Sequence, residues 1–420
     1  MSKLKLFAII WAMVVAIMAG FLYTPLPEGI EDPFGAIVFM AFWKILVRYP
    51  QLTREFFGQG RYLDNLEAMQ IHIFQEDEMR PISSWFGGLN VTRSTIAGVP
   101  VIVYKHWDDE DADLRPGFVY FHGGGWIAAS ADVYDWTVYD IAMRTGVVAI
   151  NVDYRLAPQH PFPAGFDDVV SVTRYILRHG KKFGIDVSRV GVAGDSAGGN
   201  LAAATALHLS KMSSDLPQLK YQVLLHPVLQ GLTFRLPAHL DNAETFPILY
   251  AKHIAAFASI YLGLGGRNGE FHGTIFFENH HVSPEFRTKS KYAKYVDEKN
   301  LPEKYRTPKK TAPIINDSHN ETIFQRIKSL IVDPRFSPLM ADDLTKLPPT
   351  MVVVQKYDVL RDDGLLYAKR LRDSGVETVV HDGKGFHIDH LKLAPEFIHS
   401  KTGAKAVKDV CKFISRITRS

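Results

Sequence analysis

The stretch GVAGDSAGGNLAAATALHL, residues 191–209, places a single serine where a strand is expected to become a helix. Residues 190–193 are small and apolar, as in a buried strand, and alanine and leucine dominate after the glycines, as in a helix. Serine and glycine are weak helix formers, yet Ser196 lies among three glycines. The form G-x-S-x-G lets a strand turn sharply and expose one hydroxyl. The sequence therefore predicts a nucleophile at Ser196, in a turn completed by Gly194, Asp195, Ala197 and Gly198.

A second glycine-rich stretch, VYFHGGGW at residues 119–126, follows another expected strand. Successive glycines leave their backbone amides uncovered, so that a ligand can approach them closely. A tetrahedral intermediate concentrates negative charge on one oxygen, and backbone amides can stabilise that charge. We therefore expect Gly123, Gly124 and Ala197 to form an oxyanion hole, with His122 and Gly125 completing the motif.

Short apolar runs alternate with helical segments from residue 101 onward, a pattern typical of an α/β protein. Such a chain forms a mostly parallel sheet with helices on both faces. The expected strands are residues 101–104, 118–121, 147–152, 190–193, 222–226, 351–354 and 378–381. The expected helices lie near residues 136–144, 167–178, 198–209, 365–374 and 404–417.

The alternation stops between about residues 235 and 330, which we interpret as an insertion. This segment is rich in aromatic and basic residues, and residues 287–310 carry nine Lys or Arg against three Asp or Glu. The basic run favours a solvated surface, with contact to lipid headgroups as the alternative.

The N-terminus begins with an uncharged run of 17 residues, 7–23, preceded by Lys3 and Lys5. Three interpretations compete: a cleaved signal peptide, an uncleaved signal-anchor and a buried helix. The length of the run and the lack of a small-residue cleavage site favour the anchor. The two lysines would hold the N-terminus in the cytosol, so the remainder would face a lumen. A second apolar run, residues 34–47, is too short to span; it could lie at the membrane surface, cover a pocket or pack as an ordinary helix.

Composition excludes little else. The net charge of +3 gives no indication of nucleic-acid binding, and the oligomeric state is not indicated. Cys411 is the single cysteine, so no disulfide can form within the chain. Three N-x-S/T sequences, at Asn90, Asn316 and Asn320, are candidates for glycosylation.

Three motifs together carry a resemblance: HGGGW, DYRLAPQHPFPAGFDD at residues 153–168, and GDSAGGN at residues 194–200. The chain resembles the hormone-sensitive-lipase branch of the α/β-hydrolases, and its length and N-terminal run are most similar to the microsomal arylacetamide deacetylases and neutral cholesterol ester hydrolases. The resemblance implies an α/β-hydrolase core, a helical lid and an endoplasmic reticulum membrane anchor. It also implies that the lid lacks a disulfide that some deacetylases carry. The predicted divisions are a cytosolic stub and transmembrane anchor at 1–24, an N-terminal lid segment at 25–95, core at 96–234, a lid insertion at 235–330 and core at 331–420.

A serine hydroxyl needs a base, and the base needs an orienting acid, which α/β-hydrolases supply in the order Ser, Asp or Glu, His. Asp358 follows an expected strand, and the family motif matches it. Its rivals Asp362 and Asp363 are interpreted as acids that satisfy the free amides at the start of a helix. The family pattern likewise selects His387, in the glycine-containing loop DGKGFHIDH, over His381 on the strand and His390 at the start of the terminal helical region.

The sequence thus predicts a serine hydrolase with the triad Ser196, Asp358 and His387, which forms an acyl-enzyme on esters or amides and needs no metal or organic cofactor. The aromatic lid and the membrane anchor suggest an apolar substrate that partitions into lipid, of the arylacetamide, acylglycerol or cholesteryl ester type, with membrane lipid as a partner. The alternative is a non-catalytic ligand-binding protein on the same fold, similar to the plant gibberellin receptors, which lack the working histidine. The presence of all three triad candidates argues against that alternative.

Overall fold

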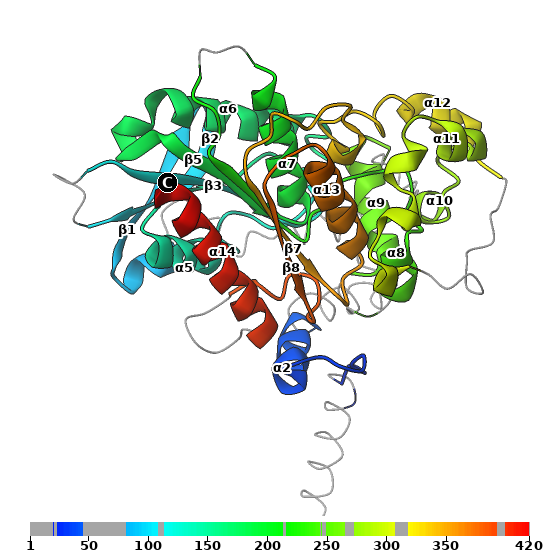
Figure 1. Cartoon of the computed structure of the whole chain (residues 1–420). Helices are drawn as coiled ribbons and strands as arrows, with labels where there is room; N and C mark the ends of the chain where they lie inside the picture. The colour runs from blue at the N-terminus through cyan, green and yellow to red at the C-terminus, as the bar shows by residue number, and fades with distance from the viewer. Residues whose placement is uncertain are drawn as a thin grey trace, which may run out of the picture.

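The computed structural model describes residues 20, 23–44, 81–107, 113–212, 216–243, 245, 249–264, 273–306, 318–392 and 400–419. Its centre is an eight-stranded sheet in the order β1-β2-β4-β3-β5-β6-β7-β8 (Figure 1). The β1–β2 and β2–β4 pairs are antiparallel, and all pairs from β4 to β8 are parallel. The strands are β1 (Leu89–Ile96), β2 (Val99–His106), β3 (Arg115–Phe121), β4 (Val148–Val152), β5 (Ile185–Asp195), β6 (Tyr221–Leu225), β7 (Thr350–Gln355) and β8 (Thr378–Gly383).

The expected strands correspond to β2 through β8, whereas β1 was not predicted. β1 lies almost wholly inside the segment 25–95 that the sequence analysis assigned to the lid. It is an edge strand, paired only with β2. Because its four central residues, Thr92–Thr95, are exposed and polar, β1 lacks the apolar run of the inner strands.

The longer helices cover both faces of the sheet, as predicted (Figure 1). On one face α5 (Asp135–Thr145) contacts α14 (Lys401–Arg419). On the other face lie α6 (Ala164–His179), α7 (Ala197–Ser210) and α13 (Arg361–Asp373), with α7 and α13 both contacting the 3₁₀ turn η8 (Pro338–Met340). The smaller 3₁₀ turns of the core are η2 (Ile82–Trp85) and η3 (Gly180–Phe183).

The core is continuous between the sheet and these helices. β4, β6 and β7 are buried along their whole length, as suits parallel strands covered on both faces. α7 is almost completely buried, and its many alanines let it lie close to β5 and β6. Each Leu or Val buried here contributes about 1.5–3 kcal/mol relative to an exposed one.

The insertion folds into short helices at one end of the sheet (Figure 1). Tyr261 of this segment stacks on Trp126 of the glycine-rich loop, with ring centroids 4.6 Å apart and planes within 3°. The insertion is therefore held against the carboxyl edge of the sheet. Its helices are α8 (Pro237–Asp241), α9 (Ala251–Tyr261), α10 (Gly273–Phe277), α11 (Pro284–Lys289) and α12 (Glu321–Ile327), with 3₁₀ turns η4 (Ala293–Tyr295), η5 (Glu298–Asn300) and η6 (Glu303–Tyr305).

Near the N-terminus the helix α2 (Pro33–Trp43) accounts for most of the second apolar run. Asp32 caps it by accepting a hydrogen bond from the Gly35 amide. Met40 is buried, whereas Phe34 is 78% exposed, so α2 packs with one face and presents apolar surface on another. No helix among the described residues has the length and apolar character needed to cross a bilayer. The predicted anchor, residues 7–23, lies outside the described residues except at positions 20 and 23.

Candidate active site

Ser196 occupies the sharp turn between β5 and α7 that the G-x-S-x-G sequence predicts. Its backbone has φ +53° and ψ −118°, a conformation that costs a residue with a side chain about 1–3 kcal/mol. Backbone hydrogen bonds hold it there, since the Ser196 amide donates to the Leu225 carbonyl at 2.8 Å and its carbonyl accepts from the Asn200 amide at 3.1 Å. A Cβ at Gly198 would collide with the carbonyl groups of the loop after β3. The turn therefore requires its small residues.

His387 and Asp358 are joined by a hydrogen bond of 3.0 Å between His387 Nδ1 and Asp358 Oδ1. Asp358 follows β7 and His387 follows β8, and both side chains are buried. Ser196 follows β5, two strands away from β7. Because β5 to β8 run parallel, all three residues lie at the same, carboxyl edge of the sheet, where α/β proteins place their sites.

Asp358 is held in its charged form. Burial would raise the pKa of this carboxyl group, but His387 and a further histidine, His226, together keep it below the ordinary value. The amide of Leu360 also donates to Asp358 Oδ1, at 3.0 Å. A fixed carboxylate at this position orients the His387 ring, with Nδ1 toward the acid and Nε2 away from it.

The rival acids Asp362 and Asp363 lie in the first turn of α13, as predicted, but the expected use of their carboxylates is wrong. Neither caps its own helix. Asp362 accepts from the Ala238 amide at 2.7 Å, and Asp363 accepts from the Leu229 amide at 2.9 Å. They bind segments more than a hundred residues earlier in the chain, a partnership that local sequence does not reveal. Burial raises the pKa of Asp363 to about 7.

The rival histidines are also accounted for. His381 lies on β8, as predicted, with Nδ1 3.0 Å from Asp409 Oδ2 on α14. The expectation that His390 begins the terminal helical region is wrong, because α14 begins at Lys401. His390 is instead buried, with Nε2 3.9 Å from Asp195 Oδ2.

The glycine-rich loop is anchored by residues of both motifs. Asp195 accepts hydrogen bonds from the phenols of Tyr120 at 2.9 Å and Tyr134 at 2.8 Å. His122 is buried, and its ring stacks on Tyr154 at 4.3 Å between centroids. Asp195, the last residue of β5 and the neighbour of Ser196, thus braces the loop that carries the predicted oxyanion donors.

The predicted donors differ in their surroundings. Gly124 has φ +109°, which suits glycine, and Gly125 has φ +65° with the ring of Phe257 in the space a side chain would fill. Burial and Asp195 raise the pKa of Tyr134. Its phenol oxygen occupies part of the space that a side chain at Gly123 would fill, so Tyr134 packs against the loop.

His226 is the residue of this site that the sequence analysis missed. It lies just after β6, fully buried, and its Nδ1 is 3.3 Å from Asp358 Oδ2. It is the last residue of the expected strand 222–226. Its position was the available signal, since polar residues at the carboxyl ends of neighbouring parallel strands converge. Two groups of described residues bring possible metal ligands within 4.8 Å, and both contain His226: one with Asp389 and His390, the other with Asp358 and His387.

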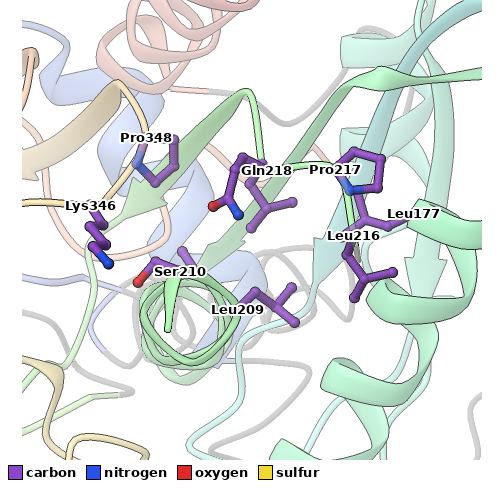
Figure 2. A pocket seen from close by; sticks show the side chains of 10 residues that line it. Leu177, Leu209, Ser210, Leu216, Pro217, Gln218, Lys346 and Pro348 are labelled. Carbon is purple, nitrogen blue, oxygen red and sulfur yellow. The ribbon is translucent and has the colours of Figure 1, made fainter. Parts of the chain in front are cut away.

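Two cavities lie elsewhere in the described part of the chain. One, of about 180 Å³, is lined by Leu209 and Ser210 at the end of α7 and by Leu216–Leu219 before β6 (Figure 2). It is therefore at the amino edge of the sheet, away from Ser196. The other, of about 560 Å³, is lined by residues within 233–237 and 287–298, most of which belong to the insertion. Neither is lined by the predicted triad.

Comparison with known proteins agrees with this fold. Residues 118–278 and 291–390 match the family described as "alpha/beta hydrolase fold". The chain is 37% identical to arylacetamide deacetylase of Oryctolagus cuniculus over 89% of this chain and 92% of that protein. It is 33% identical to neutral cholesterol ester hydrolase 1 of Bos taurus over 89% and 90% of the two chains.

Two solved esterases have a similar structure. The hyperthermophilic esterase of Pyrobaculum calidifontis matches with a TM-score of 0.56 and 27% identity, over 79% of this chain and 87% of that one. A thermostable esterase of Pseudomonas putida shares the fold, with a TM-score of 0.59 and 22% identity over 94% and 98%. Since the sheet, the serine turn and the matched relatives agree, the chain belongs to the α/β-hydrolase family, in the branch of the arylacetamide deacetylases and neutral cholesterol ester hydrolases, and is a hydrolase of ester or amide bonds.

Proposed function

We propose that the chain is a membrane-anchored serine hydrolase that cleaves carboxylic esters or amides of apolar substrates through an acyl-enzyme. The observation that carries this proposal is the 3.0 Å hydrogen bond between His387 and Asp358 at the sheet edge where the Ser196 turn also lies. A buried, charged carboxylate on Nδ1 is what makes a histidine an effective base for a serine hydroxyl. The pairing of Asp358 with His387 therefore supports acyl transfer at Ser196.

In the proposed reaction, His387 Nε2 removes the proton from Ser196 as Oγ attacks the substrate carbonyl. His387 then gives that proton to the leaving alcohol or amine, and the acyl group stays on Ser196. In the second half, His387 removes a proton from water as the water attacks the acyl group. His387 then returns the proton to Ser196 Oγ, and the carboxylic acid product leaves. Asp358 stabilises the imidazolium that forms in each half. These steps use only side chains and amides of the chain itself.

The oxyanion is proposed to bind at the amides of the glycine-rich loop and of Ala197, at the N-terminus of α7. The two loop donors predicted are Gly123, which has the Tyr134 phenol in the space a side chain would fill, and Gly124, which has the left-handed φ of +109°. The positive end of α7, a helix of 14 residues, adds favourable potential at this point.

The substrate is proposed to be an arylacetamide, an acylglycerol or a cholesteryl ester, the classes that the names of the relatives suggest. Aromatic side chains support an apolar substrate. Phe257 lies against Gly125, and Trp126 stacks on Tyr261 beside the proposed oxyanion hole. Residues 25–88, which precede the edge strand β1, and residues 235–330 are proposed to form the lid over the site.

Residues 1–24 are proposed to hold the protein in the endoplasmic reticulum membrane as a single-pass type II anchor, with the catalytic part in the lumen. The outward-facing Phe34 of α2 would then lie near the bilayer, only a few residues beyond the anchor. Glycosylation at Asn90, Asn316 or Asn320 would follow from this orientation. Protease protection of intact microsomes, with and without detergent, tests the topology; digestion of the catalytic part without detergent would refute it.

Activity-based labelling tests the chemistry. A fluorophosphonate probe should label the full-length wild type, and the Ser196→Ala variant should lose all labelling. His387→Ala and Asp358→Ala should label at strongly reduced rates. A panel of p-nitrophenyl esters of graded chain length and of arylacetamides then identifies the substrate class. Specific binding of these compounds by folded protein without turnover would refute the proposed function and favour a ligand-binding role.

A further inference from the structure

Behind His387, imidazoles and carboxylates alternate in the buried interior. Asp358 presents Oδ1 to His387 at 3.0 Å and Oδ2 to His226 Nδ1 at 3.3 Å. The other nitrogen of His226, Nε2, lies 3.8 Å from Asp389 Oδ1. One carboxylate is thus flanked by two histidines, of which the reaction described above uses only one.

His226 is held in place by burial and by its backbone. Its side chain is fully buried, and its amide donates to the Val353 carbonyl at 2.9 Å. Its backbone has φ +46°, a strained value that the hydrogen bonds between β6 and β7 maintain. Among the described residues, neither ring nitrogen of His226 nor Asp358 Oδ2 forms a hydrogen bond of normal geometry. His226 Nδ1 and Asp358 Oδ2 nevertheless lie at the ion-pair distance of 3.3 Å.

The charges around His226 favour a proton on it. Burial lowers the pKa of His226, but Asp358, Asp389 and Asp195 outweigh burial and raise it. His390, which stacks on His226 at 5.1 Å between centroids, has a pKa far below normal because of burial and of the neighbouring His226 and His387. These two shifts therefore favour protonation of His226 over protonation of His390.

We propose that His226 is a positioning residue: it holds Asp358 Oδ2 from behind, so that Oδ1 stays directed at His387. This inference rests on the proposed function. Without His226 the carboxylate would have one fixed oxygen and one buried oxygen without a donor, and it could turn away from the catalytic ring. The effect would appear in the chemical step, because His226 does not reach the substrate.

A metal ion would be a different use of the same atoms, since His226, Asp389 and His390 lie close together. The two rings are stacked, with planes 25° apart. A metal binds in the plane of each imidazole, so stacked rings do not direct their nitrogens at one point. The geometry favours the hydrogen-bonded arrangement.

The test compares variants of the full-length protein, with turnover expressed per fluorophosphonate-titrated site. His226→Asn keeps an N–H donor at the place of Nδ1, whereas His226→Gln moves the donor to the place of Nε2 and His226→Phe removes it. The expected fall in kcat is about 10- to 100-fold for Phe and Gln, the factor for losing one hydrogen bond to a charged group, with KM within about twofold. His226→Asn should recover most of the loss.

A pH profile separates positioning from damage to the core. Replacing His226 removes a positive charge that faces Asp358. Without this charge the catalytic base binds a proton more readily, so the acid limb of the pH profile of kcat/KM should move to higher pH in all three variants. His281→Phe is the matched control, because His281 is equally buried but neutral, with a pKa lowered to about 4 by burial, and packs on Phe276. It should leave the acid limb in place.

Several results would overturn the inference. Equal kcat in the Asn and Gln variants would show that the donor position is irrelevant, even if the Phe variant fails to fold. An unmoved acid limb would assign His226 a packing role alone. Zinc inhibition of the wild type that is lost in His390→Phe would assign the cluster to a metal. Failure of the proposed function is recognised separately, because the wild type itself would then resist fluorophosphonate labelling.

Discussion

Replacing Asp195 by Asn should slow catalysis without weakening substrate binding. Asp195 is fully buried and accepts hydrogen bonds from two phenols, those of Tyr120 at 2.9 Å and Tyr134 at 2.8 Å. Asparagine offers one acceptor oxygen, so one phenol loses its acceptor and faces an N–H₂ group instead. Loss of one buried hydrogen bond to a charged group costs about 1.5–3 kcal/mol of stability.

The expected loss of activity follows from the contact between Tyr134 and the glycine-rich loop. Tyr134 lies against Gly123, so its release shifts the loop that carries the proposed oxyanion donors. Complete loss of one such donor lowers kcat about 10²–10³-fold, and a displaced loop should lose part of that, about 10- to 100-fold. KM should change little, since the ground-state carbonyl makes weaker use of the donors.

A double-mutant cycle gives the measurement. Asp195→Asn, Tyr134→Phe and the double variant are compared in kcat and in unfolding by denaturant. If Asp195 acts through Tyr134, the effects of the two single variants on kcat should be less than additive in the double variant, because both disturb the same contact. Strict additivity of the two effects, or a kcat equal to that of the wild type in Asp195→Asn, would refute this reasoning.

Three further outcomes are expected. Gly198→Ala should yield little folded protein and no fluorophosphonate labelling, because the added methyl would meet main-chain oxygens that cannot move aside. Burial raises the pKa of Asp363 from an ordinary 3.8 to about 7 in the fold, so the free energy of unfolding of the wild type should fall relative to that of Asp363→Asn as pH rises from about 4 to 7 and then level off; a constant difference in denaturant midpoints across that range would contradict this. Phe257→Ala should open space beside the glycine-rich loop and shift the preference in an ester panel toward bulkier acyl or alcohol groups, and an unchanged ranking of substrates would place Phe257 outside the binding site.

Much of the fold could be predicted because its signals are local. The inner strands are apolar runs, and the turn at Ser196 is a sequence of five residues. The two glycine-rich motifs each follow a buried strand, so their place at the carboxyl edge needs only the rule for parallel sheets. Asp358 and His387 required more, since several acids and histidines follow the last strands and only the resemblance to a family selected among them.

What escaped prediction depends on contacts between distant segments. β1 was missed because an edge strand with exposed polar residues has no apolar run. The partners of Asp362 and Asp363 lie more than a hundred residues away, and no spacing reveals them. His226 was missed for the same reason: a histidine that ends a strand gains meaning only when the neighbouring strand brings Asp358 to within 3.3 Å.

The loop that carries the proposed catalytic acid is also where the insertion is fastened. Asn242, just after α8, donates hydrogen bonds to the carbonyls of Lys356 and Asp358 at 3.1 and 3.0 Å. Asp362 accepts a hydrogen bond from the Ala238 amide at the start of α8. Grafting a foreign insertion onto this scaffold to change its substrate range would therefore disturb the acid unless these three tethers were copied with it. Substitutions that change specificity can therefore be made in the outer helices of the insertion. Residues 237–242, which contact the loop of the catalytic acid, should be kept unchanged.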